Sequence, residues 1–312
     1  MVTAHFTRPI RQNRPLALPA LLVANIVLAI GPWLVRLAQS EGGVGPIAAG
    51  VWRLTLALPI LAIAAWRIER PRLRFGRVEA MIALGGIAFA ADLATWHIGI
   101  LHTRLANATL FGNMAAILFP LYGFLIARTW PRARQWLALA AAILGAVLLF
   151  GRSFALSADH VWGDAACLFA GVCYTGYMIA LDRAGGRLPP ISTLLLSSLI
   201  GIPVLLIAAT AMGEAIVPHD WTPLILLALG SQVLGQGLVV YSVSRVSPIL
   251  FGVMLLTQPI VAASIGWLIY RERITAPDVL GAAAIIAAVV LVRDNRRPAP
   301  LPGPETALEE AA

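Results

Sequence analysis

Apolar runs of about 20 residues recur along the whole chain and are separated by short polar turns. Folded as a helix, a run of this length crosses the roughly 30 Å of hydrocarbon in a bilayer. Charged residues make up only 12% of the chain, whereas a soluble domain carries about 25%. The pattern predicts an all-α integral membrane protein surrounded by a lipid bilayer. A β-barrel is disfavoured because no run alternates in polarity.

Ten such runs predict ten transmembrane helices joined by short loops. The first run follows Arg8, Arg11 and Arg14, as in a signal peptide. It is longer than the roughly 7–15 apolar residues of a signal peptide and lacks a clear cleavage site, so we expect a retained span. The predicted spans are 16–37, 46–66, 79–100, 106–127, 134–150, 163–182, 190–211, 222–242, 248–269 and 276–292.

The arginines predict how the chain is oriented in the membrane. All 23 basic residues are arginines, gathered in the loops and near the two ends. With a cytoplasmic N-terminus, seventeen lie on the cytoplasmic side and five outside, while Arg53 falls within a span. Cytoplasmic loops carry such an excess of positive charge. We therefore expect both termini in the cytoplasm, and the net charge of +8 does not indicate a nucleic-acid partner.

The two halves of the chain resemble each other in order and composition. The first reads HTRLANATLFGNMAAILFPLYGFLI and then PRARQWLALAAAILGAVLL; the second reads VSRVSPILFGVMLLTQPIVAASIGWLIY and then RERITAPDVLGAAAIIAAVVLV. Each half holds five spans, an odd number, so the second is inverted in the membrane relative to the first. The predicted divisions are a cytoplasmic segment 1–15, five-helix repeats 16–150 and 163–292, and a Pro- and Glu-rich cytoplasmic tail 293–312 that is expected to be disordered.

Features of the second half connect this layout to a known family. Pro259 is followed 13 residues later by Glu272 in an R-E-R turn, and Gly281 opens the last helix. With the duplicated five-span layout, these features resemble the EamA repeats of the drug/metabolite transporter (DMT) superfamily. The turn TWPRARQW in the first half lacks the glutamate, so Glu272 is given no role. The resemblance implies a multi-pass transporter of the bacterial inner membrane that moves amino acids, nucleobases, vitamins or related metabolites.

The segment 89–120 holds the densest set of polar residues within apolar sequence. A charge at mid-bilayer costs about 2.5–3.5 kcal/mol on insertion scales, so ionisable residues there are functional candidates. Asp92 and Trp96 are four residues apart and share a helix face, as do Gln232 and Gln236 in the corresponding span of the second half. The predicted substrate-binding residues are Asn25, Trp33, Arg53, Asp92, Trp96, His97, Asn113, Tyr174, Gln232 and Gln236.

Two of these charged residues allow more than one role. Arg53 could bind a substrate carboxylate with both arms of its guanidinium, extend toward the membrane surface, or pair with Asp92. Asp92 could relay protons together with His97, or pair with Arg53 as a structural contact. Proton coupling of the transport is therefore left open.

These observations predict a secondary transporter, an exporter of a small metabolite that works by alternating access. A flippase of a lipid-linked molecule is the alternative and would require a lateral opening between helices. An intramembrane enzyme is disfavoured because G-x-S-x-G, H-E-x-x-H and paired carboxylates within spans are missing, and an ATP-driven pump because no P-loop is present. Cys167 and Cys173 are interpreted as packing residues, so no metal or cofactor is expected. The oligomeric state, monomer or homodimer, stays open.

Overall fold

The protein is helical throughout its described part. The computed structural model describes residues 16–41, 43–70, 76–103, 105–128, 130–150, 158–185, 187–258, 260–261, 264 and 275–292. The helices are α1 (Ala17–Leu28), α2 (Gly31–Ser40), α3 (Pro46–Ala64), η1 (Ala65–Glu69), α4 (Arg77–His102), α5 (Leu105–Gly112), α6 (Ala115–Ala127), α7 (Ala133–Phe150), η2 (Ala158–His160), α8 (Val161–Ala184), α9 (Pro190–Ala211), α10 (Thr222–Leu226), η3 (Leu227–Gln236), α11 (Gly237–Val243), α12 (Pro248–Leu255) and α14 (Ala276–Val292).

Helices long and apolar enough to cross a membrane confirm the membrane fold. Two further apolar helices, Ala133–Leu148 and Ala276–Val292, are shorter. The predicted span 248–269 lies partly outside the described residues, as do Pro259 and Glu272, so the count of ten stays a prediction. The described part contains seven long spans: Ala17–Ser40, Pro46–Glu69, Arg77–His102, Asn107–Ala127, Val161–Ala184, Pro190–Ala211 and Thr222–Val243.

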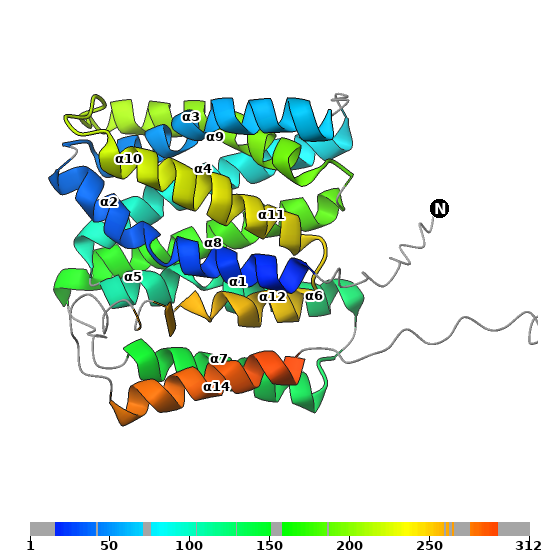
Figure 1. Cartoon of the computed structure of the whole chain (residues 1–312). Helices are drawn as coiled ribbons and strands as arrows, with labels where there is room; N and C mark the ends of the chain where they lie inside the picture. Colours follow the sequence, from blue (N-terminus) through cyan, green and yellow to red (C-terminus); the bar gives the residue numbers. More distant parts are fainter. Residues whose placement is uncertain are drawn as a thin grey trace, which may run out of the picture.

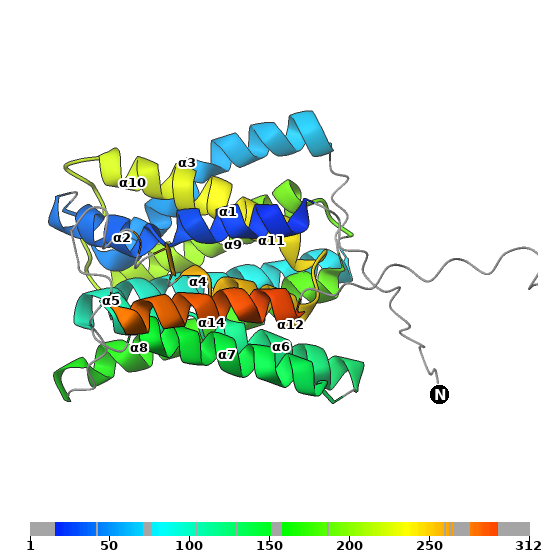
Figure 2. The same cartoon turned by 60° about the horizontal axis from the view of Figure 1, so that its bottom comes forward.

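The helices lie side by side in one bundle (Figure 1, Figure 2). α4 packs along α8 and α9, while α3 packs along α9 and η3. α7 and α14 pack against each other at one edge of the bundle (Figure 1). Each begins after a cap with the same spacing: the Gln135 side chain accepts the N–H of Arg132, and that of Asp278 accepts the N–H of Thr275. Helices far apart in sequence thus form matched pairs.

α3 and α9 cap each other at both ends. The Glu69 carboxylate, at the end of η1, accepts the backbone N–H groups of Ile191 (2.9 Å) and Ser192 (2.8 Å) at the start of α9. The Glu214 carboxylate, three residues beyond α9, accepts those of Ile47 (3.2 Å) and Ala48 (2.8 Å) at the start of α3. A carboxylate at a helix N-terminus satisfies N–H groups that have no partner within the helix and interacts favourably with its dipole.

The sequence around these caps has the same spacing in both helices. Pro46 opens α3 and Pro190 opens α9, and each is followed 13 residues later by a second proline, Pro59 or Pro203. The capped residues are the first and second after the opening proline in both cases. The two helices therefore cap each other in the same way, as expected for an inverted repeat.

Removing either cap is expected to destabilise the protein. Replacing Glu69 or Glu214 with alanine leaves two buried or half-buried N–H groups without their acceptor, at a cost of about 0.5–2 kcal/mol in unfolding free energy. The two losses should add, because the caps lie at opposite ends of the helix pair. Thermal unfolding in detergent measures the effect, with the exposed Glu41→Ala as matched control. Equal stability of all three variants would contradict the capping role.

Candidate functional site

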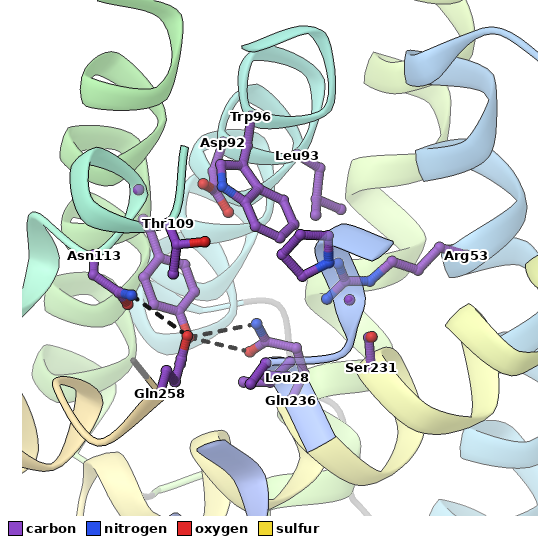
Figure 3. A pocket seen from close by; sticks show the side chains of 15 residues that line it. Leu28, Arg53, Asp92, Leu93, Trp96, Thr109, Asn113, Ser231, Gln236 and Gln258 are labelled. Atoms are coloured by element: carbon purple, nitrogen blue, oxygen red, sulfur yellow. Dashed lines mark hydrogen bonds between the residues drawn. The ribbon is translucent and has the colours of Figure 1, made fainter. Parts of the chain in front are cut away.

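A polar cavity of about 80 Å³ lies at the centre of the bundle. Since roughly 10–15 Å³ is enough for one water molecule, the cavity holds several waters or a small solute. It is far below the roughly 300–1,000 Å³ of a pocket for a drug-sized ligand. The lining residues are Leu28, Ala29, Gly31, Pro32, Arg53, Asp92, Leu93, Trp96, Thr109, Gly112, Asn113, Tyr174, Ser231, Gln236 and Gln258 (Figure 3).

The cavity is located where helices are interrupted. The first span breaks between α1 and α2, just before Pro32, whose ring cannot continue the hydrogen bonding of the preceding turn. α5 ends at Gly112 next to Asn113, and α12 ends at Leu255, shortly before Gln258. Residues at all three breaks line the cavity. Broken helices at mid-membrane are tolerated where they border a polar cavity, and they form binding sites in many transporters.

Arg53 on α3 supplies the positive charge of the cavity. Its side chain is 2% exposed, and its guanidinium lies 5.9 Å from the ring centre of Phe89. The Nε atom donates to Oε1 of Gln232 at 3.1 Å, and Nε2 of Gln232 donates to Oγ of Ser198 at 3.0 Å. Gln232 and Ser198 are fully buried. This series of hydrogen bonds, from Ser198 on α9 through Gln232 on η3 to Arg53 on α3, orients the guanidinium. The two terminal nitrogens of Arg53 take no part in it.

Asp92 on α4 supplies the negative charge. In Figure 3 its carboxylate, Thr109 and Asn113 lie on the side of the cavity opposite Arg53. Within the described residues, no hydrogen bond or ion pair occupies the Asp92 carboxylate, and the buried Ser231 hydroxyl has no partner. A cation, an anion and a hydroxyl thus border one small space, and within the described residues they form no hydrogen bond or ion pair with one another.

Two aromatic rings stack one helical turn away from residues that line the cavity. One turn along α4 from Asp92, and one turn along α8 from Tyr174, the rings of Phe89 and Tyr177 stack with centres 4.7 Å apart. Both side chains are fully buried. Tyr174 itself makes long contacts with Gln236, of 3.4 and 3.5 Å. The stacked pair does not line the cavity, but its close packing obstructs the path between these helices.

Six of the ten predicted residues line the cavity: Arg53, Asp92, Trp96, Asn113, Tyr174 and Gln236. The structure places the other four, Asn25, Trp33, His97 and Gln232, elsewhere. Trp33 is 47% exposed on the outer surface of the bundle. His97 is fully buried between α4 and α3, with Nδ1 2.8 Å from the carbonyl oxygen of Pro46. It therefore holds the start of α3 and does not border the cavity.

Asn25 and Gln232 lie behind the cavity wall and position residues that line it. The Asn25 amide donates to the Met254 carbonyl (2.6 Å) at the broken end of α12, and its oxygen accepts from Gln258 at 3.1 Å. Gln258, which lines the cavity, in turn lies 3.5 Å from Asn113 (Figure 3).

Gln232 and Gln236, which are predicted to share a helix face, have different surroundings in the structure. η3 is a π-helix over Leu227–Gln236, with hydrogen bonds from residue i to i+5. Ser231 and Gln236 face the cavity, while Gln232 turns toward Arg53.

Sequence reasoning missed Ser231, Gln258 and the backbone at Gly31–Pro32. Gln258 had a detectable signal, since it is a polar residue within an apolar run directly before a proline. Ser231 had none, because a single serine within a span is more often satisfied by its own helix. Among the described residues, no cluster of three His, Cys, Asp or Glu could hold a metal ion.

A bundle of apolar helices, interrupted around a small charged cavity at mid-span, defines a helical membrane transporter. Comparison of the sequence with known families gives the particular one. The chain belongs to the EamA-like transporter family, which matches residues 15–151 and 161–293. This confirms the expected resemblance and implies a multi-pass transporter rather than an enzyme.

Individual proteins agree with this assignment. The threonine/homoserine exporter RhtA of Escherichia coli (strain K12) is 30% identical over 274 residues, which cover 82% of this chain and 88% of that protein. The protein of the same name from Salmonella typhimurium (strain LT2) is 29% identical over 251 residues, covering 77% and 80%. A crystal structure with 17% identity superposes with a TM-score of 0.73 over 90% of this chain and 98% of the other, which supports the fold.

Proposed function

We propose that this chain exports a small zwitterionic amino acid, or a close relative of one, across the bacterial inner membrane. The observation that carries the proposal is the placement of Arg53 and Asp92 on opposite sides of one small cavity (Figure 3). A guanidinium binds a carboxylate with two parallel hydrogen bonds, and a carboxylate binds an ammonium group. An amino acid carries both groups a few bonds apart. The relatives named as threonine/homoserine exporters support the same class of substrate.

Alternating access is the mechanism that this geometry favours. Residues from both predicted repeats, 16–150 and 163–292, line the cavity, and in this proposal the stacked Phe89 and Tyr177 form its closed floor. With the orientation indicated by the arginines, that floor faces the cytoplasm. Export requires the floor to open toward the cytoplasm, the substrate to bind between Arg53 and Asp92, and the opposite side to open afterwards. Coupling to protons through Asp92 is part of the proposal.

Transport by the purified protein in proteoliposomes tests the function. Labelled threonine and homoserine, and a pool of other amino acids and nucleobases, are offered with and without a pH gradient. We expect uptake of the amino acids above that of empty liposomes, and faster uptake with the gradient. Folded protein that moves no component of the pool would reject the proposal and favour the alternative of a lipid-linked cargo.

The contact between Gln232 and Arg53 predicts a specific kinetic defect. Gln232→Leu removes the acceptor of the Arg53 Nε atom, so the guanidinium loses its fixed orientation. The donor is a charged guanidinium, so this bond contributes about 1.5–3 kcal/mol, and its full loss corresponds to a KM raised about 10- to 100-fold at nearly unchanged maximal rate. Ser198→Ala is the matched control, since it keeps the Gln232–Arg53 bond and should have a smaller effect. A wild-type KM for Gln232→Leu would exclude the positioning role.

A further inference from the structure

A second cavity, of about 260 Å³, lies apart from the central one, where α8 ends, α9 begins and α11 ends. Its walls are mostly apolar, but Arg187 and Arg245 both line it, together with the hydroxyl residues Thr193 and Ser244. Among the described residues, its lining includes no aspartate or glutamate. Asp182, on the last turn of α8, is fully buried and is not part of the lining.

The position of this cavity places it at the depth of the lipid headgroups. Val161–Ala184, Pro190–Ala211 and Thr222–Val243 are membrane-crossing helices, and the cavity lies between one end of each. The ends of such helices lie where the hydrocarbon gives way to the polar headgroup region. The distribution of arginines predicts that this end faces the cytoplasm.

The side chains around the cavity are arranged to attract an anion. Arg245 is held in place, since its Nη1 donates to the Tyr241 carbonyl at 2.5 Å and its guanidinium lies 4.1 Å from the centre of the Tyr241 ring. Arg187 is exposed and follows the left-handed turn at Gly185 that ends α8. Both arginines line the same partly enclosed space, so an anion bound there would be attracted by two positive charges.

The Thr193 hydroxyl and the first N–H groups of α9 already have partners. The hydroxyl of Thr193 donates to the carbonyl of Pro189 at 2.9 Å. The first N–H groups of α9 donate to Glu69, so the end of this helix contributes no free donors for a ligand at Ile191 and Ser192. Attraction of an anion therefore depends on the two arginines.

We propose that this cavity binds the phosphate group of an anionic lipid, or of a soluble phosphate ester, through Arg187 and Arg245. Guanidinium groups bind phosphate oxygens with paired, charge-assisted hydrogen bonds. Basic pockets between membrane helices on the cytoplasmic side are typical sites for anionic headgroups. The apolar walls from Leu181, Leu188 and Val240 suit the glycerol and upper acyl region of a lipid. The proposal does not depend on which solute is transported.

Titration of the purified full-length protein tests the site. Native mass spectrometry measures binding of phosphatidylglycerol and phosphatidylcholine, and a thermal-shift titration measures binding of inorganic phosphate. We expect phosphatidylglycerol to bind more tightly than phosphatidylcholine. Arg187→Gln and Arg245→Gln should each weaken this binding roughly tenfold, the loss expected for one charge-assisted hydrogen bond. Arg134→Gln, which removes an exposed arginine outside the cavity, should leave it within about twofold.

The outcomes separate the two sources of phosphate. Binding of phosphatidylglycerol that depends on Arg187 and Arg245 establishes a lipid site, whereas arginine-dependent binding of inorganic phosphate without lipid preference establishes a soluble ligand. Equal binding of the two lipids together with no phosphate effect, or unchanged binding in both variants, would overturn the proposal. Because Arg187 is exposed, its variant keeps the test valid even where Arg245→Gln disturbs the fold.

Discussion

Replacing Arg53 with glutamine is expected to weaken transport of the amino acid roughly 10- to 100-fold, because a hydrogen bond to a charged group contributes about 1.5–3 kcal/mol. The matching amine, which lacks the carboxylate, should be transported equally by the variant and the wild type. The difference arises because Arg53 is the arginine that lines the cavity, opposite Asp92 (Figure 3). Initial rates over a range of substrate concentrations in proteoliposomes measure transport of the amino acid and of the amine by both proteins.

Two further variants make the test of Arg53 specific. Arg53→Lys keeps the charge but lacks the planar fork, so it should recover only part of the affinity. Arg183→Gln removes an exposed arginine of α8 that does not line the cavity, and it should transport like the wild type. If Arg53→Gln lost the amino acid and the amine to the same degree, Arg53 would support the fold and not the carboxylate of the substrate.

Replacing Asp92 with asparagine is expected to abolish the response of transport to a pH gradient and to weaken amino-acid transport roughly tenfold or more. Asparagine has nearly the same shape, but it neither carries a negative charge nor exchanges a proton. The carboxylate borders the cavity and has no hydrogen bond or ion pair within the described residues, so both a substrate ammonium and a proton can reach it. Uptake with and without the gradient, at several external pH values, measures the effect.

Asp220 provides a control carboxylate outside the spans. The backbone N–H of Thr222 donates to it at 2.8 Å and lowers the pKa of this exposed carboxyl below its usual value. It therefore stays ionised at the pH values of the assay, and Asp220→Asn should leave the pH profile unchanged. A wild-type pH profile in Asp92→Asn would exclude Asp92 as the coupling group.

Part of the cavity could be predicted from the sequence because the helices concerned are regular. α4 is an unbroken α-helix over Arg77–His102, so the spacing of four residues between Asp92 and Trp96 correctly placed both on one face. Arg53 and Tyr174 were recognisable as polar side chains deep within apolar runs. For these residues the local rule and the tertiary structure agree.

Other predicted positions were decided by distant contacts. His97 is one residue from Trp96, yet its ring faces α3, where the Pro46 carbonyl provides a partner. Asn25 is used to hold the broken end of α12, more than two hundred residues away in the chain. The sequence signals both residues as polar within a membrane span, but it does not say which neighbouring helix will satisfy their hydrogen bonds.

The sequence by itself determined that this protein crosses a membrane as a bundle of helices, because long apolar runs have no other stable arrangement in hydrocarbon. It also indicated two similar halves and the polar segment near their interface. Only the tertiary structure decided which polar side chains meet. In η3, Gln232 contacts Arg53 and Ser231 lines the cavity, while Glu69 and Glu214 cap the ends of distant helices. The physical reason is that helix period and hydrogen-bond partners within a bundle depend on packing between helices, which no local pattern encodes.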